Sequence, residues 1–127
     1  MIYGIGVDLI KVERMREAVD RWGEKFLRRV FTEKELARCR RARDPHLSMA
    51  VRFAAKEALI KAVGMTAGAA FTDIEVLNDE LGKPYITVKG KLQVFFKIKE
   101  ISKAHLSLSH EKEYGVASVV LEKKTVV

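Results

Sequence analysis

The stretch Arg52–Lys61, Arg-Phe-Ala-Ala-Lys-Glu-Ala-Leu-Ile-Lys, constrains the fold more than any other part of the chain. It lies in a helix predicted over about residues 45–63, because Asp44 can cap its start, a proline fits its first turn and Gly64 suits its end. Over residues 49–63, eleven side chains are apolar and four are charged, and the apolar ones surround the helix axis. Such a helix is normally buried, so its charges have to be paired, bound to a ligand or placed at a pocket edge.

Four charged residues interrupt this apolar helix. Glu57 and Lys61 are four residues apart and share one face, whereas Arg52 and Lys56 lie on another. One interpretation is a local Glu57–Lys61 ion pair, which would contribute roughly 0.2–0.5 kcal/mol. The other is a functional site, which the apolar surroundings favour without identifying a reaction.

The segment Ile2–Ile10 predicts a buried strand in which Gly4 and Gly6 leave space beside the backbone. Asp8 stands near its carboxyl end. It could cap the following helix or serve as a carboxylate for metal or phosphate chemistry, and the two interpretations carry equal weight. Asp8 and Glu57 together would offer the hard oxygen ligands that suit Mg²⁺, which usually keeps several waters and binds substrate phosphates.

The net charge of +7 is concentrated in one region. Residues 11–43 contain twelve Lys or Arg and six Asp or Glu, whereas the rest of the chain has twelve against eleven. This imbalance indicates an acidic partner, such as a nucleic acid, an acidic protein or a phosphorylated ligand. Cys39 is the only cysteine, and no apolar run approaches the roughly 20 residues of a membrane span. We therefore expect a cytoplasmic protein without a membrane partner.

The other elements follow from local patterns. In chain order, they are helices at about 12–29 and 33–41, a β-hairpin at 72–88, a helix at 91–100 and strands at 104–109 and 114–122. Gly23 should bend or divide the first helix, and Thr32 with Glu35 forms a capping box before the second. Residues 78–82 supply the hairpin turn, and the small residues at 64–70 predict a mobile loop.

This order of elements is not the regular alternation of a doubly wound fold. We predict a single α+β domain over residues 1–127, with a small antiparallel sheet packed against helices on one side. The sequence contains no glycine-rich phosphate loop, no Cys/His set for zinc and no nucleophilic elbow around a serine. Asp8, Glu57 and Lys61 therefore remain as the candidates for chemistry.

Four groups of residues, taken together, resemble one family. They are Gly4-Ile5-Gly6-Val7-Asp8 followed by Arg14, the Arg52–Ala58 block with Lys61, Gly82-Lys83-Pro84-Tyr85, and Ser107-Leu108-Ser109-His110 with Glu113-Tyr114. With these groups the chain resembles the holo-acyl-carrier-protein synthases, the short bacterial type of 4′-phosphopantetheinyl transferase. The resemblance runs from Met1 to about Glu122, and the Arg52–Lys61 block is its most specific part.

The resemblance implies a Mg²⁺-dependent transfer of 4′-phosphopantetheine from coenzyme A to a serine of apo acyl carrier protein, with release of adenosine 3′,5′-bisphosphate. The implied catalytic residues are Asp8, Glu57 and Lys61, of which Asp8 and Glu57 would bind the Mg²⁺. Glu57 would help to deprotonate the serine, directly or through a metal-bound water, and Lys61 would stabilise the phosphate in transit or the leaving group. The implied contacts to coenzyme A are Arg52, Lys61, Gly82, Lys83, Pro84 and His110.

The resemblance also accounts for the basic region, because acyl carrier proteins are strongly acidic and the family docks them on its first helix. Arg14, Arg21 and Arg28 match this basic row. Ala18 stands where a larger side chain could pack, for which Trp22 could compensate. The family also forms homotrimers with active sites between subunits, which is the assembly that the resemblance implies for this chain.

Two other classes of function compete with this transferase. The basic residues of 11–43 could belong to a nucleic-acid-binding module, but no helix-turn-helix, zinc-finger or single-strand-binding signature is apparent and aromatic residues are sparse there. A subunit-interaction protein without catalysis would leave the charges of the buried helix unexplained. We therefore expect an enzyme without a nucleic-acid partner.

Overall fold

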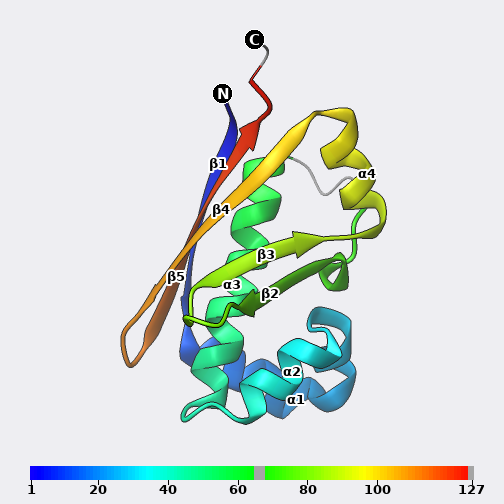
Figure 1. Ribbon diagram of the computed structural model, residues 1–127. Helices are drawn as coiled ribbons and strands as arrows, with labels where there is room; N and C mark the ends of the chain where they lie inside the picture. Colours follow the sequence, from blue (N-terminus) through cyan, green and yellow to red (C-terminus); the bar gives the residue numbers. More distant parts are fainter. Residues whose placement is uncertain (65–67, 126–127) are drawn as a thin grey trace.

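The computed structural model describes residues 1–64 and 68–125, which form an α+β fold (Figure 1). In chain order, the elements are β1 (Ile2–Lys11), α1 (Val12–Val30), α2 (Glu33–Arg40), α3 (Pro45–Val63), the 3₁₀ turn η1 (Phe71–Asp73), β2 (Ile74–Asn78), β3 (Pro84–Val88), α4 (Gly90–Ile98), β4 (Ile101–His110) and β5 (Tyr114–Lys123). The predicted fold class is confirmed. Residues 65–67 of the predicted loop lie outside the described residues.

The strands form two antiparallel sheets, where the sequence predicts one. The larger sheet has the order β1-β5-β4, and β2 pairs with β3 in a separate hairpin. The hairpin is separate because β2 buries Ile74 and Val76 in the core beside α3 and pairs only with β3. β4 also begins at Ile101, earlier than predicted, so that it pairs with β5 along most of its length.

Helix α3 occupies the centre of the molecule, between the three-stranded sheet and the β2–β3 hairpin (Figure 1). Its start and end agree with the prediction. The side chain of Asp44 accepts a hydrogen bond from the backbone N–H of Leu47 at 3.2 Å, and Gly64 ends the helix with a φ of 91°. Helices α1 and α2 gather at one end of α3, and α4 lies at the other (Figure 1).

Strand β1 is buried on one face only, so the prediction of a fully buried strand is wrong for the single chain. Gly4 and Gly6 face α3, where an added Cβ would lie 2.0 Å from the carbonyl oxygen of Ala62 and 1.9 Å from that of Ala58. Successive strand residues point to opposite faces. Ile10 shares the face of Gly4 and Gly6 and is buried, whereas Ile5, Val7 and Leu9 point away from α3 and are 68%, 59% and 65% exposed.

The first helical region follows two of its predicted local signals. Gly23 divides α1 with a φ of 62° and a ψ of −146°, a conformation that glycine adopts far more readily than other residues. Thr32 and Glu35 form both hydrogen bonds of the capping box at the start of α2. Among the described residues, no helix combines the length and the hydropathy needed to cross a membrane.

Candidate active site

The close contact between β1 and α3 brings the predicted catalytic residues together. Asp8 lies on the same face of β1 as Gly4 and Gly6, and therefore points toward α3. There the ammonium group of Lys61 donates hydrogen bonds to Asp8 Oδ1 at 3.0 Å and to the carbonyl oxygen of Val7 at 3.1 Å. The ion pair of Lys61 thus crosses from α3 to β1, and the local pair with Glu57 is not the contact that it makes.

Glu57 shares a pocket with Asp8. The pocket has a volume of about 360 Å³ and lies between β1, α3 and α1, with Met15 and Phe26 among its apolar lining residues. Burial raises the pKa of Glu57, the negative charge of Asp8 raises it further, and Lys61 opposes both effects. A carboxylate with a raised pKa beside a second carboxylate is typical of sites that bind a cation or accept a proton.

These two carboxylates fit a hydrated Mg²⁺ ion. Mg²⁺ is usually held by one or two carboxylates, several waters and substrate phosphates, so a full set of protein ligands is not required. Among the described residues, no cluster of three or more His, Cys, Asp or Glu side chains is arranged to hold a metal ion. Asp8 and Glu57 offer the two carboxylates that such a site uses together with water and a ligand phosphate.

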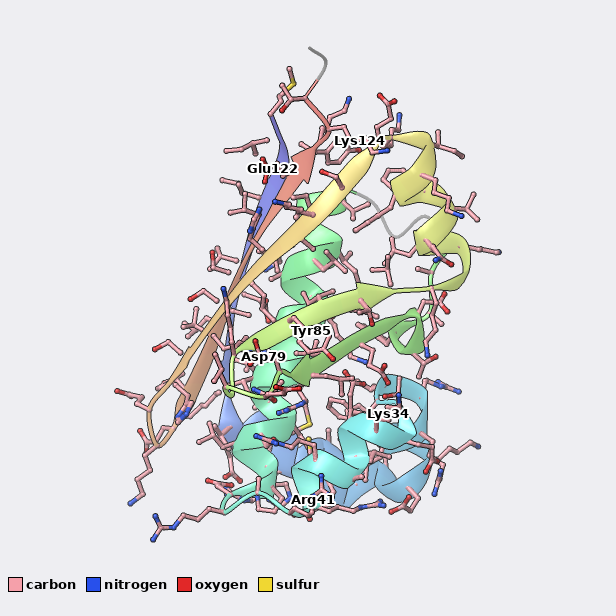
Figure 2. The ribbon with its side chains drawn as sticks, in the orientation of Figure 1. Lys34, Arg41, Asp79, Tyr85, Glu122 and Lys124 are labelled. Atoms are coloured by element: carbon pink, nitrogen blue, oxygen red, sulfur yellow. The ribbon has the colours of Figure 1, made fainter. Side chains whose placement is uncertain are left out.

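A second pocket, of about 650 Å³, gathers most of the predicted coenzyme contacts. Arg52 of α3, Gly82 and Pro84 of the hairpin and His110 at the end of β4 line it. Its other charged lining residues are Arg38, Arg41, Arg43 and Asp44. Figure 2 shows Arg41 in the loop after α2 and Asp79 at the hairpin turn. We call this cavity the arginine pocket and the cavity of Asp8 and Glu57 the carboxylate pocket.

Arg52 is held rigidly in the arginine pocket. It is 6% exposed, and its Nη1 donates to Ser48 Oγ at 2.7 Å while its Nη2 donates to Asn78 Oδ1 at 2.8 Å. Its Nε has no hydrogen-bond partner within the described part of the chain. A buried guanidinium with a spare donor, beside three further arginines, is suited to a phosphate group.

Sequence reasoning missed the two residues that hold Arg52. The sequence places Asn78 only in the hairpin turn. In the structure its Oδ1 accepts from Arg52 and its Nδ2 donates to the carbonyl oxygen of Gly82 at 3.0 Å, so it joins Arg52 to that turn. Ser48 precedes Arg52 by four residues in α3, and this helical spacing could have identified it.

Two predicted coenzyme contacts lie apart from the arginine pocket lining. Lys83 is exposed in the turn between Gly82 and Pro84, where its backbone N–H donates to Asp79 Oδ1 at 2.9 Å. Lys61 lines neither pocket, but it pairs with Asp8, which lines the carboxylate pocket. The predicted contacts to coenzyme A are thus divided between the arginine pocket with its neighbouring turn and the ion pair of Lys61 with Asp8.

The predicted docking arginines fall on two separately oriented parts of α1. Arg14 and Arg21 precede the Gly23 kink and are exposed, and Arg14 also lines the carboxylate pocket. Arg28 follows the kink and is engaged in ion pairs with Glu33 and, at 3.5 Å, with Glu24. The break at Gly23 therefore interrupts the row that a continuous helix would have presented.

Ala18 and Trp22, where an apolar side chain could contact the carrier protein, lie at or next to the carboxylate pocket. Ala18 lines the carboxylate pocket, and Trp22 is exposed and lines a neighbouring cavity together with Phe26. The guanidinium carbon of Arg21 lies 5.4 Å from the centre of the Trp22 ring. The region thus combines positive charge with apolar surface.

The two main pockets have no lining residue in common among the described residues. Both use α3, but Arg52 and Glu57 point into different cavities. A shallower hollow at the end of the three-stranded sheet shares Leu9 with the carboxylate pocket and His110 with the arginine pocket.

Comparisons with known proteins relate the whole chain to one group. The sequence model of the 4′-phosphopantetheinyl transferase superfamily matches residues 4–119. A holo-[acyl-carrier-protein] synthase of Halothermothrix orenii is 44% identical over 123 residues, which cover 96% of this chain and 98% of the relative.

Solved structures agree with the sequence comparisons. The crystal structure of holo-[acyl-carrier-protein] synthase from Neisseria meningitidis matches with a TM-score of 0.89 and 38% identity, covering 97% of this chain and all of that one. The synthase from Bacillus anthracis, solved in complex with CoA (3′,5′-ADP), matches with a TM-score of 0.80 and 41% identity, covering 98% of this chain and 99% of that one.

Proposed function

Because the chain belongs to the holo-acyl-carrier-protein synthases of the 4′-phosphopantetheinyl transferase superfamily, we propose that it transfers 4′-phosphopantetheine from coenzyme A to a serine of apo acyl carrier protein in a Mg²⁺-dependent reaction. The serine Oγ forms a bond to the pantetheine-linked phosphorus, and the bond from that phosphorus to the bridging oxygen breaks. Adenosine 3′,5′-bisphosphate is the other product. The observation that carries the proposal is the meeting of Asp8, Glu57 and Lys61 at the contact between β1 and α3.

Each of these residues has a role that follows from its chemistry. Asp8 and Glu57 would hold the Mg²⁺, which supplies charge neutralisation at the pyrophosphate of coenzyme A. Glu57 accepts the proton of the serine hydroxyl, directly or through a metal-bound water. Lys61 donates hydrogen bonds to the phosphate oxygens as negative charge moves to the leaving group.

The arginine pocket would bind the nucleotide end of coenzyme A. The buried Arg52, with its spare Nε donor, and the arginines of the loop after α2 support a phosphate at this place. Gly82, Pro84 and His110 complete the walls, and Lys83 beside them remains a predicted contact. The charge of the lining residues thus supports the proposal that the adenosine 3′-phosphate binds in this pocket.

We also propose that the chain acts as a homotrimer. Ile5, Val7 and Leu9 project from the outer face of the three-stranded sheet, opposite α3, and this apolar face suits further copies of the same chain. The separation of the two pockets supports the same arrangement, since the arginine pocket of one protomer could meet the carboxylate pocket of its neighbour. The proposed setting is the cytoplasm, which suits a chain whose single cysteine is a free thiol.

Replacement of Glu57 by Gln tests the proposed function. Transfer of labelled phosphopantetheine from coenzyme A to apo acyl carrier protein, measured with saturating Mg²⁺, should fall by about a hundredfold or more because the variant loses a metal ligand and a base. Glu111→Gln, at an exposed site in the β4–β5 turn, is the matched control and should keep full activity. Transfer by Glu57→Gln at the wild-type rate would refute the role of Glu57.

A further inference from the structure

A fully buried ion pair joins α3 to α2, outside the proposed catalytic groups. The side chains of Lys56 and Glu35 are both 0% exposed, and Lys56 Nζ lies 2.7 Å from Glu35 Oε1. The same ammonium group donates to the carbonyl oxygen of Val30 at 2.7 Å and to that of Phe71 at 3.1 Å. All three donors of Lys56 are therefore used, and they tie α3 to the end of α1 and to η1.

Glu35 extends the connection to two further segments. Its Oε1 also accepts the backbone N–H of Thr32 at 2.8 Å, which is the capping-box bond of α2. Its Oε2 accepts the backbone N–H of Val76 in β2 at 2.8 Å. One ion pair thus fixes five segments relative to one another, namely α1, α2, α3, η1 and β2.

The segments that the pair fixes carry the walls of both pockets. Lys56 directly precedes Glu57, and it holds the end of the same half of α1 that places Phe26 in the carboxylate pocket. On the other side, Val76 is two residues from Asn78, which orients Arg52 in the arginine pocket. The pair therefore fixes elements that line both pockets, although Glu35 and Lys56 line neither of them.

We propose that Glu35 and Lys56 are a positioning pair, which aligns α1 and the β2–β3 hairpin with Glu57 and Arg52 on α3. The proposal rests on the proposed transferase function and adds two residues that act through others. Stability alone does not account for such a pair, since well-packed apolar side chains of similar volume often replace a buried ion pair without loss of stability. Its directional hydrogen bonds supply what apolar packing does not, a fixed orientation of each segment.

The double variant Glu35→Leu with Lys56→Met tests whether the pair positions the groups of the two pockets or only stabilises the fold. Its Tm should fall, because the backbone N–H groups and carbonyl oxygens that the pair binds lose their partners. Activity is therefore compared at a temperature at which every variant is fully folded. The kcat/KM of the double variant for apo acyl carrier protein should still fall between about tenfold and a hundredfold, because small displacements of catalytic groups carry costs of this size. The affinity for coenzyme A should fall as well, because Glu35 no longer holds Val76, two residues from the Asn78 side chain that orients Arg52.

Two further proteins complete the test. Leu92→Ala enlarges a distant part of the core in α4 and should lower Tm while kcat/KM stays at the wild-type value, which shows that lost stability alone does not reduce turnover. Should the apolar double variant not fold, Glu35→Gln with Lys56→Met keeps an amide oxygen for a backbone N–H and replaces it in the same comparison.

The outcomes distinguish this proposal from the function on which it rests. A folded double variant with wild-type kcat/KM would overturn the positioning role and leave the transferase function intact. Lowered kcat/KM in a double variant that is fully folded at the assay temperature, beside wild-type kcat/KM for Leu92→Ala, supports the positioning role. Absence of transfer by the wild-type chain itself would refute the proposed function and, with it, the positioning role.

Discussion

Lys61 illustrates how single residues find partners that local spacing does not reveal. It lies one helical turn from Glu57, yet its hydrogen bonds go to Asp8 and to the backbone of β1. Helix periodicity places Glu57 and Lys61 on one face, and this part of the site is predictable from sequence. The strand that crosses that face is not, because the crossing depends on the contact of Gly4 and Gly6 with α3.

In the metal-free protein, the free energy of unfolding should depend on pH through Glu57. Burial and the charge of Asp8 raise its pKa in the folded state. The folded protein therefore holds this proton at a pH where the unfolded chain has lost it, so stability decreases as pH rises from the ordinary glutamate pKa through the raised one. Glu57→Gln lacks this titration, and its Tm should gain on that of the wild type as pH rises above about 4, the ordinary glutamate pKa.

Calorimetry of the two proteins over that range measures the effect. The exposed Glu111→Gln, whose position lies in the β4–β5 turn, serves as the control and should follow the wild type at every pH. A Tm difference between Glu57→Gln and the wild type that stays constant with pH would contradict the raised pKa.

At the scale of elements, local signals identify where helices begin and end but not what else the same residues bind. The Thr32–Glu35 capping box is predictable because its two members are three residues apart. The pairing of Glu35 with Lys56 is not, since Lys56 is distant along the chain and lies on a helix whose pattern resembles an ordinary buried one. Gly23 likewise predicts a bend in α1, but not the change in direction that separates Arg28 from Arg14 and Arg21.

The kink in α1 leads to unequal roles for the basic residues. Reversal of both Arg14 and Arg21 to Glu should raise KM for acyl carrier protein by about tenfold at low salt, since each lost exposed pair is worth up to roughly 1 kcal/mol. Arg28→Glu should raise KM less, because Arg28 is already engaged with Glu24 and Glu33.

Steady-state kinetics with varied carrier and saturating coenzyme A measure these changes. KM for coenzyme A should stay constant in Arg28→Glu, whereas the double reversal can also raise it because Arg14 lines the carboxylate pocket. Added salt should reduce the differences in KM for the carrier, since exposed charges are screened beyond about 10 Å at 0.1 M salt. Equal effects of Arg28→Glu and of the double reversal would contradict a divided docking surface.

At the scale of the whole molecule, the sequence predicts that β1 is buried, but the single chain leaves the outer face of this strand exposed. The strand Ile2–Lys11 is rich in apolar residues, so sequence alone indicates burial on both faces. Its inner face is partly glycine, and Ile5, Val7 and Leu9 lie outside. The α+β class could be predicted because element order determines it, whereas the division into two sheets depends on how β2 packs beside α3.

A charge on this outer face should disrupt the proposed trimer. Val7→Glu would place a carboxylate in each apolar contact between copies, and burial of an unpaired charge is costly. Light scattering should then report monomers where the wild type gives trimers, with loss of transferase activity. Thr87→Glu, on the exposed face of β3, is the control and should leave the assembly unchanged. Val7→Glu that remains trimeric and active would contradict this interface.

The contact of Gly6 with the carbonyl oxygen of Ala58 also affects how genetic data on this protein should be interpreted. A single methyl group at Gly6 would displace α3, together with Glu57 and Lys61, although Gly6 has no side chain to contribute to the chemistry. In a survey of tolerated substitutions, Gly6 should accept as few replacements as Asp8, Glu57 and Lys61. Intolerance to substitution therefore identifies two kinds of position in this protein: the residues that take part in the chemistry, and the glycine whose missing side chain allows β1 to contact α3.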